Sequence, residues 1–186
     1  MPGSCPVVVE YAIPTSAPRE CRGYTLSLPE GRAPRRLAML SNGFPDADKY
    51  LAKQAEALSS FWSTTRFRFD RKAGADQLNM GIQEPLLSEL VRECDAVVIA
   101  WGHCGSCTSG IARDAIAFAA HAVPSVMLVC EVFWEYSTWI GEALGMRKLP
   151  RVRLPFPIAG TGEQVQRACA VRIAPEIVHA LSTRPC

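Results

Sequence analysis

The chain has 186 residues, of which 48% are hydrophobic and 20% are charged, and its formal net charge at pH 7 is +2. This length and composition are typical of a single globular domain with a sizeable core and exclude a disordered chain. Basic residues occur only in short groups, and no apolar run approaches the roughly 18 residues of a transmembrane helix, so we expect neither nucleic acid nor a membrane as a partner. The start of the chain lacks the basic and apolar stretches of a secretion signal, so we expect a cytoplasmic protein.

The first 34 residues are rich in proline and glycine, and their short apolar runs are isolated from one another. We therefore predict that residues 1–34 form an extended arm or a hairpin, which packs on the domain or on a second subunit of a homodimer. Residues 35–186 have a regular pattern and are predicted to form a single α/β domain.

From residue 35 onward, short apolar segments alternate with segments of helical periodicity. The stretch DAVVIAWG (95–102) is a continuous apolar run typical of a buried parallel strand, whereas TTRFRFD (64–70) alternates like an edge strand. Strands are expected at residues 35–40, 64–70, 95–102, 124–130 and within 151–160, and helices at residues 46–62, 82–94, 109–122, 131–146 and 162–181. This alternation predicts an α/β fold with an open, doubly wound parallel sheet of about five strands, in the flavodoxin-like order 2-1-3-4-5.

Two of the eight cysteines, Cys104 and Cys107, form a C-x-x-C motif between the third strand and the third helix. In an open α/β sheet, ligands bind beyond the carboxyl ends of the strands where the strand order reverses, which here is between the first and third strands. The loop after the first strand, with Asn42 and Gly43, therefore faces the motif. We expect this loop to contribute to substrate binding.

The position of the motif at the start of a helix suits a reactive thiol. Backbone N–H groups and the positive end of the helix dipole stabilise a thiolate there. Gly105 keeps the backbone open for a substrate anion, while Ser106 and Thr108 supply hydroxyls for capping or for binding substrate. The spacing of the two cysteines suits a pair in which one thiol attacks and the other completes a disulfide.

The cysteine pair is also compatible with half of a metal site, and with a structural turn that happens to contain cysteine. A zinc site needs a second pair of ligands, and the chain has no second C-x-x-C and no H-x-H. The sequence also lacks a G-x-G-x-x-G or P-loop motif, and a flavodoxin-like sheet does not by itself imply a flavin. We therefore expect no metal and no other cofactor.

Four further residues lie at the expected catalytic edge of the sheet. His103 precedes Cys104 and is a candidate to deprotonate it or to stabilise its thiolate. Glu131 ends the fourth strand and is a candidate acid/base, or a residue that complements the helix dipole. Phe133 and Trp134 begin the following helix and are candidates to wall a pocket for an apolar substrate.

Other polar residues in these segments are expected to have structural roles. Asp46 and Asp48 are expected to cap the first helix, and Cys130 is expected to be buried filler. Arg113 and Asp114 are expected to pair with each other or with a substrate, a salt bridge between them being the default.

The sequence around the motif, CDAVVIAWGHCGSCTSGIARDAIAFAAHAVPSVMLVCEVF (94–133), resembles the UGSC family, which is named for a selenocysteine-Gly-Ser-Cys motif after a strand of this type. Similarity extends to LSNGFPDADKYLAKQAEAL (40–58) and to LPRVRLPFPI (149–158), so the resemblance covers about residues 35 to 160. Cys104 occupies the selenocysteine position, which implies that Cys104 attacks and that Cys107 is its partner. An acidic residue often precedes the motif in this family, where this chain has His103.

More distantly, this unit is similar to the selenocysteine loop of the substrate-activating subunits of glycine and proline reductases, which cleave a carbon–nitrogen bond by selenolate attack. We therefore expect an enzyme whose Cys104 thiolate attacks a small organic substrate, with Cys107 as the resolving or assisting thiol. Reductive cleavage, group transfer and addition–elimination all remain open. One alternative is a non-redox cysteine acid/base or covalent catalyst, as in racemases, lyases and acyl-transferring enzymes. Another is a thiol- or metal-binding module for sulfur or metal delivery or for redox sensing.

Overall fold

The computed structural model of the chain describes residues 27–29, 32–73, 78–146 and 148–183. Within these residues, a five-stranded parallel sheet has the strand order β2-β1-β3-β4-β5, which confirms the predicted doubly wound α/β fold. The strands are β1 (Arg36–Ser41), β2 (Arg66–Arg71), β3 (Ala96–Gly102), β4 (Ser125–Cys130) and β5 (Arg151–Leu154). The sheet order reverses between β1 and β3, so the C-x-x-C motif after β3 lies at the expected switch point.

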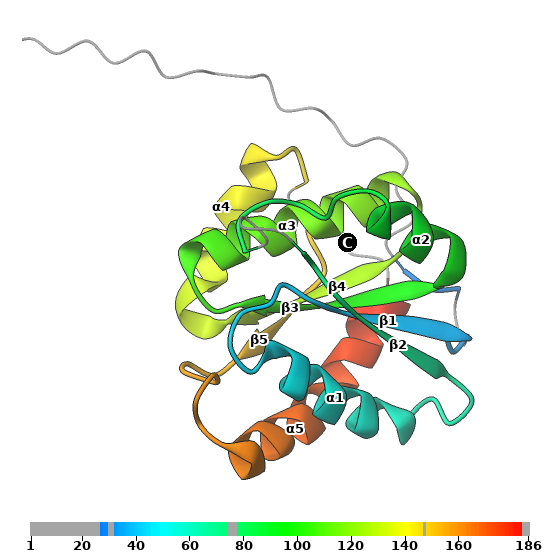
Figure 1. Cartoon of the computed structure of the whole chain (residues 1–186), viewed down its shortest axis with the longest axis vertical. Coiled ribbons are helices and arrows are strands. Elements are labelled where there is room, and N and C mark those ends of the chain that lie inside the picture. Colours follow the sequence, from blue (N-terminus) through cyan, green and yellow to red (C-terminus); the bar gives the residue numbers. More distant parts are fainter. Residues whose placement is uncertain (1–26, 30–31, 74–77, 147, 184–186) are drawn as a thin grey trace, which may run out of the picture.

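Helices cover both faces of the sheet (Figure 1). They are α1 (Ala47–Ser59), α2 (Leu86–Glu93), α3 (Gly105–Ala120), the 3₁₀ turn η1 (Glu131–Phe133), α4 (Trp134–Ala143) and α5 (Glu163–Ser182). Helices α1 and α5 lie on one face, and α2, α3 and α4 lie on the other. Not one of the helices in the described part of the chain has the length and apolarity needed to cross a membrane.

The core consists of one apolar cluster on each face of the sheet. Successive residues of β1 alternate between them: Met39 belongs to the cluster under α1 and α5, and Leu40 to the cluster under α3. Strands β3 and β4 are buried along their whole length, which accounts for their continuous apolar sequences. Strand β2 forms an edge of the sheet, and most of its residues are exposed or half-buried, as its alternating sequence predicts.

Three helices differ by several residues from the ranges expected from sequence. Helix α2 begins at Leu86, four residues after the expected start at Ile82, with Pro85 at its N-cap position. Helix α3 begins at Gly105, four residues before the expected start at Ser109, because Cys104 takes the N-cap position and its sulfur accepts a hydrogen bond from the backbone N–H of Cys107. The expected helix over 131–146 is divided into η1 and α4. The motif itself is therefore the first turn of a helix.

The end of the predicted N-terminal arm packs on the domain. The backbone N–H of Leu28 donates to the carbonyl of Leu181 in α5 at 2.6 Å, and the Leu28 side chain is buried. The hydroxyl of Thr65 donates to the carbonyl of Pro34 at 2.6 Å. Residues 1–26 of the predicted arm, and the homodimer contact expected of them, lie outside the described residues.

Candidate functional site

Cys104 and Cys107 lie at the junction of β3 and α3 and are joined by a disulfide. The Cys104 sulfur is 3.1 Å from the backbone N of Cys107 and 3.3 Å from the hydroxyl oxygen of Ser106. Cys104 is partly exposed, whereas Cys107 is fully buried below it, with 0% exposure. A molecule arriving from solvent therefore reaches the sulfur of Cys104 first.

Thr108 and Gly102 shape the turn that carries Cys104. The Thr108 hydroxyl donates to the carbonyl of Cys104 at 2.8 Å, and the Thr108 side chain is buried. A Cβ on Gly102 would lie 2.8 Å from that hydroxyl oxygen, so the close packing of β3 on α3 requires glycine here. Of the residues predicted to contact substrate, Thr108 thus has its hydroxyl hydrogen-bonded within the protein, whereas Ser106 is exposed beside the Cys104 sulfur.

The loop after β1 is tied directly to β3, as the switch-point argument predicts. Asn42 is fully buried; its side-chain amide donates to the carbonyl of Trp101 at 3.0 Å, and its side-chain oxygen accepts from the backbone N–H of Phe44 at 3.2 Å. Gly43 has a φ of 79°, a conformation that favours glycine. The two residues hold the β1–α1 loop against the motif strand, and the Asn42 side chain is engaged inside the protein rather than directed at a substrate.

His103 follows β3, and its ring lies against the loop after β5 rather than on the cysteine pair. Its Nε2 accepts hydrogen bonds from the backbone N–H groups of Ile158 and Ala159, each at 3.3 Å. A nitrogen that accepts two hydrogen bonds carries no proton, so the neutral ring is protonated at Nδ1. Burial lowers the pKa of His103, which favours this neutral form. Among the described residues, His103 makes no side-chain hydrogen bond to Cys104.

Aromatic rings surround His103. The ring centroid of Phe44 is 4.9 Å from that of His103 in a stacked arrangement, and those of Phe156 and Trp101 are 5.1 and 5.7 Å away. These rings come from the loops after β1 and β5 and from β3 itself. His103 therefore joins three regions of the chain at the carboxyl-terminal edge of the sheet, and its predicted role as the base for Cys104 gains no support from its contacts.

Glu131 and Phe133 also meet the loop after β5. The exposed Glu131 carboxylate accepts from the backbone N–H of Phe156 at 3.4 Å, and the Phe133 ring packs edge-on against the Phe156 ring, 6.1 Å between centroids. Trp134 is turned toward β5, where the guanidinium groups of Arg151 and Arg153 lie 4.2 and 4.5 Å from its ring centroid. Of the two predicted aromatic wall residues, only Phe133 contacts the loop that binds His103.

Tyr136 in α4 lies beside the motif, although no pattern in the sequence singles it out. Its hydroxyl is 2.9 Å from the hydroxyl of Ser109, and its ring edge would lie 3.9 Å from a Cβ placed on Gly105. The aromatic-rich segment indicates a helix near the site, but its spacing does not show which of its rings faces α3. Gly105 leaves room beside this ring.

Asp46 and Asp48 were expected to cap α1, but neither side chain does so. Asp46 occupies the N-cap position, but its carboxylate accepts from the backbone N–H of Gly160 at 2.9 Å and from the amide of Gln166 at 3.3 Å. The hydrogen bond from Gly160 lowers the pKa of Asp46. Asp48 pairs with Arg71 at 3.1 Å. Both side chains bind partners on neighbouring loops and strands instead of the helix terminus.

The expected pair of Arg113 with Asp114 is wrong. Asp114 is fully buried and pairs with Lys72, which follows β2, while Arg113 is exposed and donates to the carbonyl of Ser109 at 3.1 Å. Neighbours in a helix point in different directions, so one reaches the core and the other reaches solvent. The buried pair lies on α3, the helix that carries the cysteine motif.

The free thiols Cys94 and Cys130 are buried. Cys130 at the end of β4 is fully buried, as expected, and burial raises its pKa to about 12. Burial likewise raises the pKa of Cys94 to about 11. In the described part of the chain, no three His, Cys, Asp or Glu side chains come together in a group that could hold a metal ion.

The fold and the site together define a flavodoxin-like α/β protein with a cysteine pair at its topological switch point, one sulfur reachable and the other buried. The model of the UGSC family matches residues 10–183, and the chain belongs to this family. The match extends beyond the 35–160 of the resemblance at both ends and includes most of the segment predicted as an arm. No curated protein and no solved structure matched the chain.

Proposed function

We propose that this protein is a thiol-dependent enzyme in which Cys104 attacks a small organic substrate and Cys107 resolves the resulting adduct. One observation carries the proposal: at the start of α3, Cys104 is partly exposed and Cys107 is fully buried behind it within bonding distance. This asymmetry favours attack by the outer sulfur and resolution by the inner one. It agrees with the implication of the family resemblance.

The proposed reaction has two steps. The Cys104 thiolate attacks an electrophilic centre of the substrate and forms a sulfur–substrate bond, while the leaving group departs with the bonding electrons and takes up a proton. The Cys107 thiolate then attacks the Cys104 sulfur; the sulfur–substrate bond breaks, the substrate fragment takes the electron pair and a proton, and a disulfide forms. The substrate gains two electrons and the two thiols lose them. A small dithiol from the surroundings returns both cysteines to the reduced state.

The groups beside Cys104 favour its role as a nucleophile over a role as a general acid or base. The backbone N–H of Cys107 in the first turn of α3 donates to the Cys104 sulfur, and the start of a helix stabilises negative charge at this place. The Ser106 hydroxyl lies 3.3 Å from the sulfur. His103 is neutral and engaged at Nε2, so its part is to hold the loop that flanks the site. The chemistry needs reduced thiols, which is why we propose a cytoplasmic location.

Covalent trapping followed by mass spectrometry tests the proposal. The reduced protein is incubated with a panel of small electrophiles that carry different leaving groups. With the wild type we expect the Cys104–Cys107 disulfide and released product, whereas Cys107→Ser accumulates the adduct on Cys104. Cys104→Ser should give neither. Cys94→Ser removes a buried thiol elsewhere in the fold and serves as the control, with wild-type behaviour.

Three outcomes contradict the proposal in different ways. Equal and lasting adducts on Cys104 in the wild type and in Cys107→Ser favour a non-redox covalent catalyst. First modification at Cys107 reverses the assigned roles. A protein that forms no adduct but binds stoichiometric zinc, lost in either cysteine variant, is a binding module and not this enzyme.

A further inference from the structure

Strand β2 presents an unpaired backbone edge. It pairs with β1 on one side, and no described segment pairs with its other side. The backbone N–H groups of Arg66 and Lys72 donate to carbonyls at the two ends of β1. Because successive residues of a strand point their backbone groups to opposite sides, residues 67, 69 and 71 direct theirs away from the sheet. Within the described part of the chain, this edge therefore offers backbone groups to another strand.

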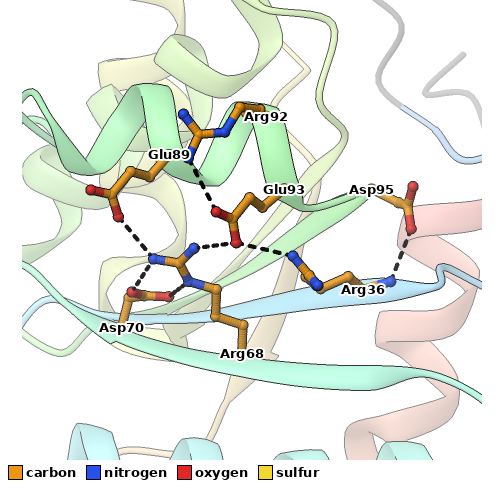
Figure 2. Close-up of polar contacts among 7 residues, drawn as sticks. All are labelled: Arg36, Arg68, Asp70, Glu89, Arg92, Glu93 and Asp95. Carbon is orange, nitrogen blue, oxygen red and sulfur yellow. Dashed lines mark hydrogen bonds and ion pairs between the residues drawn. The ribbon is translucent and has the colours of Figure 1, made fainter.

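The side chains of β2 separate into a charged face and an apolar face. On the side of α2, Arg68 binds Asp70 through two nitrogens at 2.9 and 3.0 Å and also contacts Glu89 and Glu93 (Figure 2). On the side of α1, Phe69 is 54% exposed. It borders a cavity of about 440 Å³ whose apolar wall includes Met39, Leu51 and Ala52.

We propose that β2 pairs in antiparallel orientation with β2 of a second copy of this chain, about a two-fold axis that passes through Phe69. In this register Phe69 lies opposite Phe69 of the partner subunit, and Arg68 lies opposite Asp70 of the partner subunit. The outward-pointing residues 67, 69 and 71 then form the hydrogen-bonded pairs. The contact is isologous, so the Arg68–Asp70 pair occurs twice and the Phe69 pair once, on the axis, and the two sheets become one.

The charges select this register. A shift of two residues in one direction places Arg68 opposite Arg68 of the partner subunit, and the shift in the other direction places Asp70 opposite Asp70 of the partner subunit. Like charges directly opposite each other oppose pairing. A shift of one residue pairs outward-pointing with inward-pointing backbone groups and forms no ladder. The first of the two-residue shifts also places Arg66 opposite Asp70 of the partner subunit, but of the registers near the centre of β2 only the proposed one matches backbone direction and places no like charges opposite each other within β2.

Charged side chains on an edge strand commonly prevent association, but two features of β2 favour pairing. Phe69, at the centre of the strand, is largely exposed beside an apolar cavity. Arg68 and Asp70 already lie in one layer of ion pairs, which the second copy extends across the axis (Figure 2). Strand β1 separates β2 from β3, so the contact leaves the cysteine motif open and is independent of the proposed function.

Light scattering after size-exclusion chromatography tests for the dimer with the full-length protein. At a chain concentration of about 100 µM we expect twice the chain mass of 20.3 kDa. Phe69→Lys places like charges on the axis and should halve the mass. Val171→Lys replaces a similarly exposed residue of α5, 61% exposed, and should remain a dimer. A monomeric wild type, or a Phe69→Lys protein that stays dimeric, overturns the proposal.

Cross-linking tests the register and separates this contact from one through residues 1–34. Residues on the axis of a hydrogen-bonded pair have Cα atoms roughly 5.5 Å apart, within the range of a disulfide. Mild oxidation of Phe69→Cys should therefore give a disulfide-linked dimer in which peptide mapping finds residue 69 joined to residue 69. Val171→Cys should give no such product. A dimer whose cysteine at position 69 does not cross-link has another interface and overturns the proposal.

Discussion

The ammonium group of Lys72 lies 2.9 Å from one carboxylate oxygen of Asp114 and 3.2 Å from the other, and both side chains are buried, with 4% and 0% exposure. Lys72 also donates to the carbonyl of Met80, and Asp114 accepts from the backbone N–H of Ile82 at 2.6 Å. The pair thereby joins the end of β2, the segment 78–82 and the helix that carries the cysteine motif. Two charges buried together depend on each other strongly.

At pH 8, Asp114→Asn should destabilise the protein by less than the about 3–5 kcal/mol typical of a broken buried ion pair, because it leaves the charge of Lys72 without a counter-ion but also relieves the burial of an ionised carboxylate. Adding Lys72→Met should recover most of this loss, since the remaining amide can still accept from Ile82. Chemical denaturation of the two single variants and the double variant measures the coupling. If the double variant is less stable than Asp114→Asn, Lys72 and Asp114 are not the energetically coupled pair that the structure indicates.

The Asp114 carboxyl group should also make the stability of the protein depend on pH. Burial raises the pKa of Asp114 to about 6, in spite of the nearby charges of Lys72 and Arg113. Between about pH 4 and pH 6 the folded chain then holds a proton that the unfolded chain has released. The stability of the wild type relative to Asp114→Asn should therefore fall as the pH rises through this window. Unfolding curves at pH 4, 5 and 6 check this, and a relative stability that rises with pH shows that Lys72 outweighs burial.

Gly110→Ala should destabilise the protein by about 1–3 kcal/mol through steric overlap. A Cβ on Gly110 would lie 2.2 Å from the carbonyl oxygen of Leu78, which is backbone and moves only with its whole segment. Gly105→Ala in the same helix is the matched control, because its nearest contact would be 3.9 Å away, at Tyr136. The control should be neutral or stabilising by up to about 1 kcal/mol. Equal melting temperatures for the two variants would show that segment 78–82 does not pack on α3.

His103 should act as a hydrogen-bond acceptor for the loop after β5. His103→Ala leaves the backbone N–H groups of Ile158 and Ala159 without a partner and should cost about 2 kcal/mol of stability. His103→Gln keeps an acceptor near the same place and should cost less. Proton–nitrogen correlation spectra of the wild type should show the ring proton on Nδ1. A proton on Nε2 would contradict this arrangement.

Acidification should destabilise the wild type through His103. Burial lowers the pKa of this ring, so below about pH 6.5 the unfolded chain binds a proton that the folded chain resists. The contribution of His103 is therefore present above that pH and lost as the pH falls toward the folded pKa. Comparing the unfolding of the wild type and of His103→Gln at pH 7 and pH 5 isolates it. A wild type that loses no more stability than the variant contradicts the prediction.

The order of elements and the place of the motif follow from local sequence. A continuous apolar run such as 95–102 predicts a strand buried on both faces, and the alternation of such runs with helical periodicity predicts the doubly wound sheet. The C-x-x-C motif follows one of these strands directly, so its position at the switch point is a consequence of chain order. These features depend on patterns among residues two to four positions apart in the chain, so they can be identified from the sequence alone.

The partners of the polar side chains were decided only by the tertiary structure. His103 bonds to Ile158 and Ala159 rather than to the adjacent Cys104, and Asp114 bonds to Lys72, 42 positions away, rather than to Arg113. A buried polar group must find a partner among the elements that packing brings to it, and this depends on long-range contacts rather than on neighbours in the chain. The sequence therefore determined the fold and the edge of the sheet that carries the cysteines. Packing determined which sulfur faces solvent and which residues hold it there.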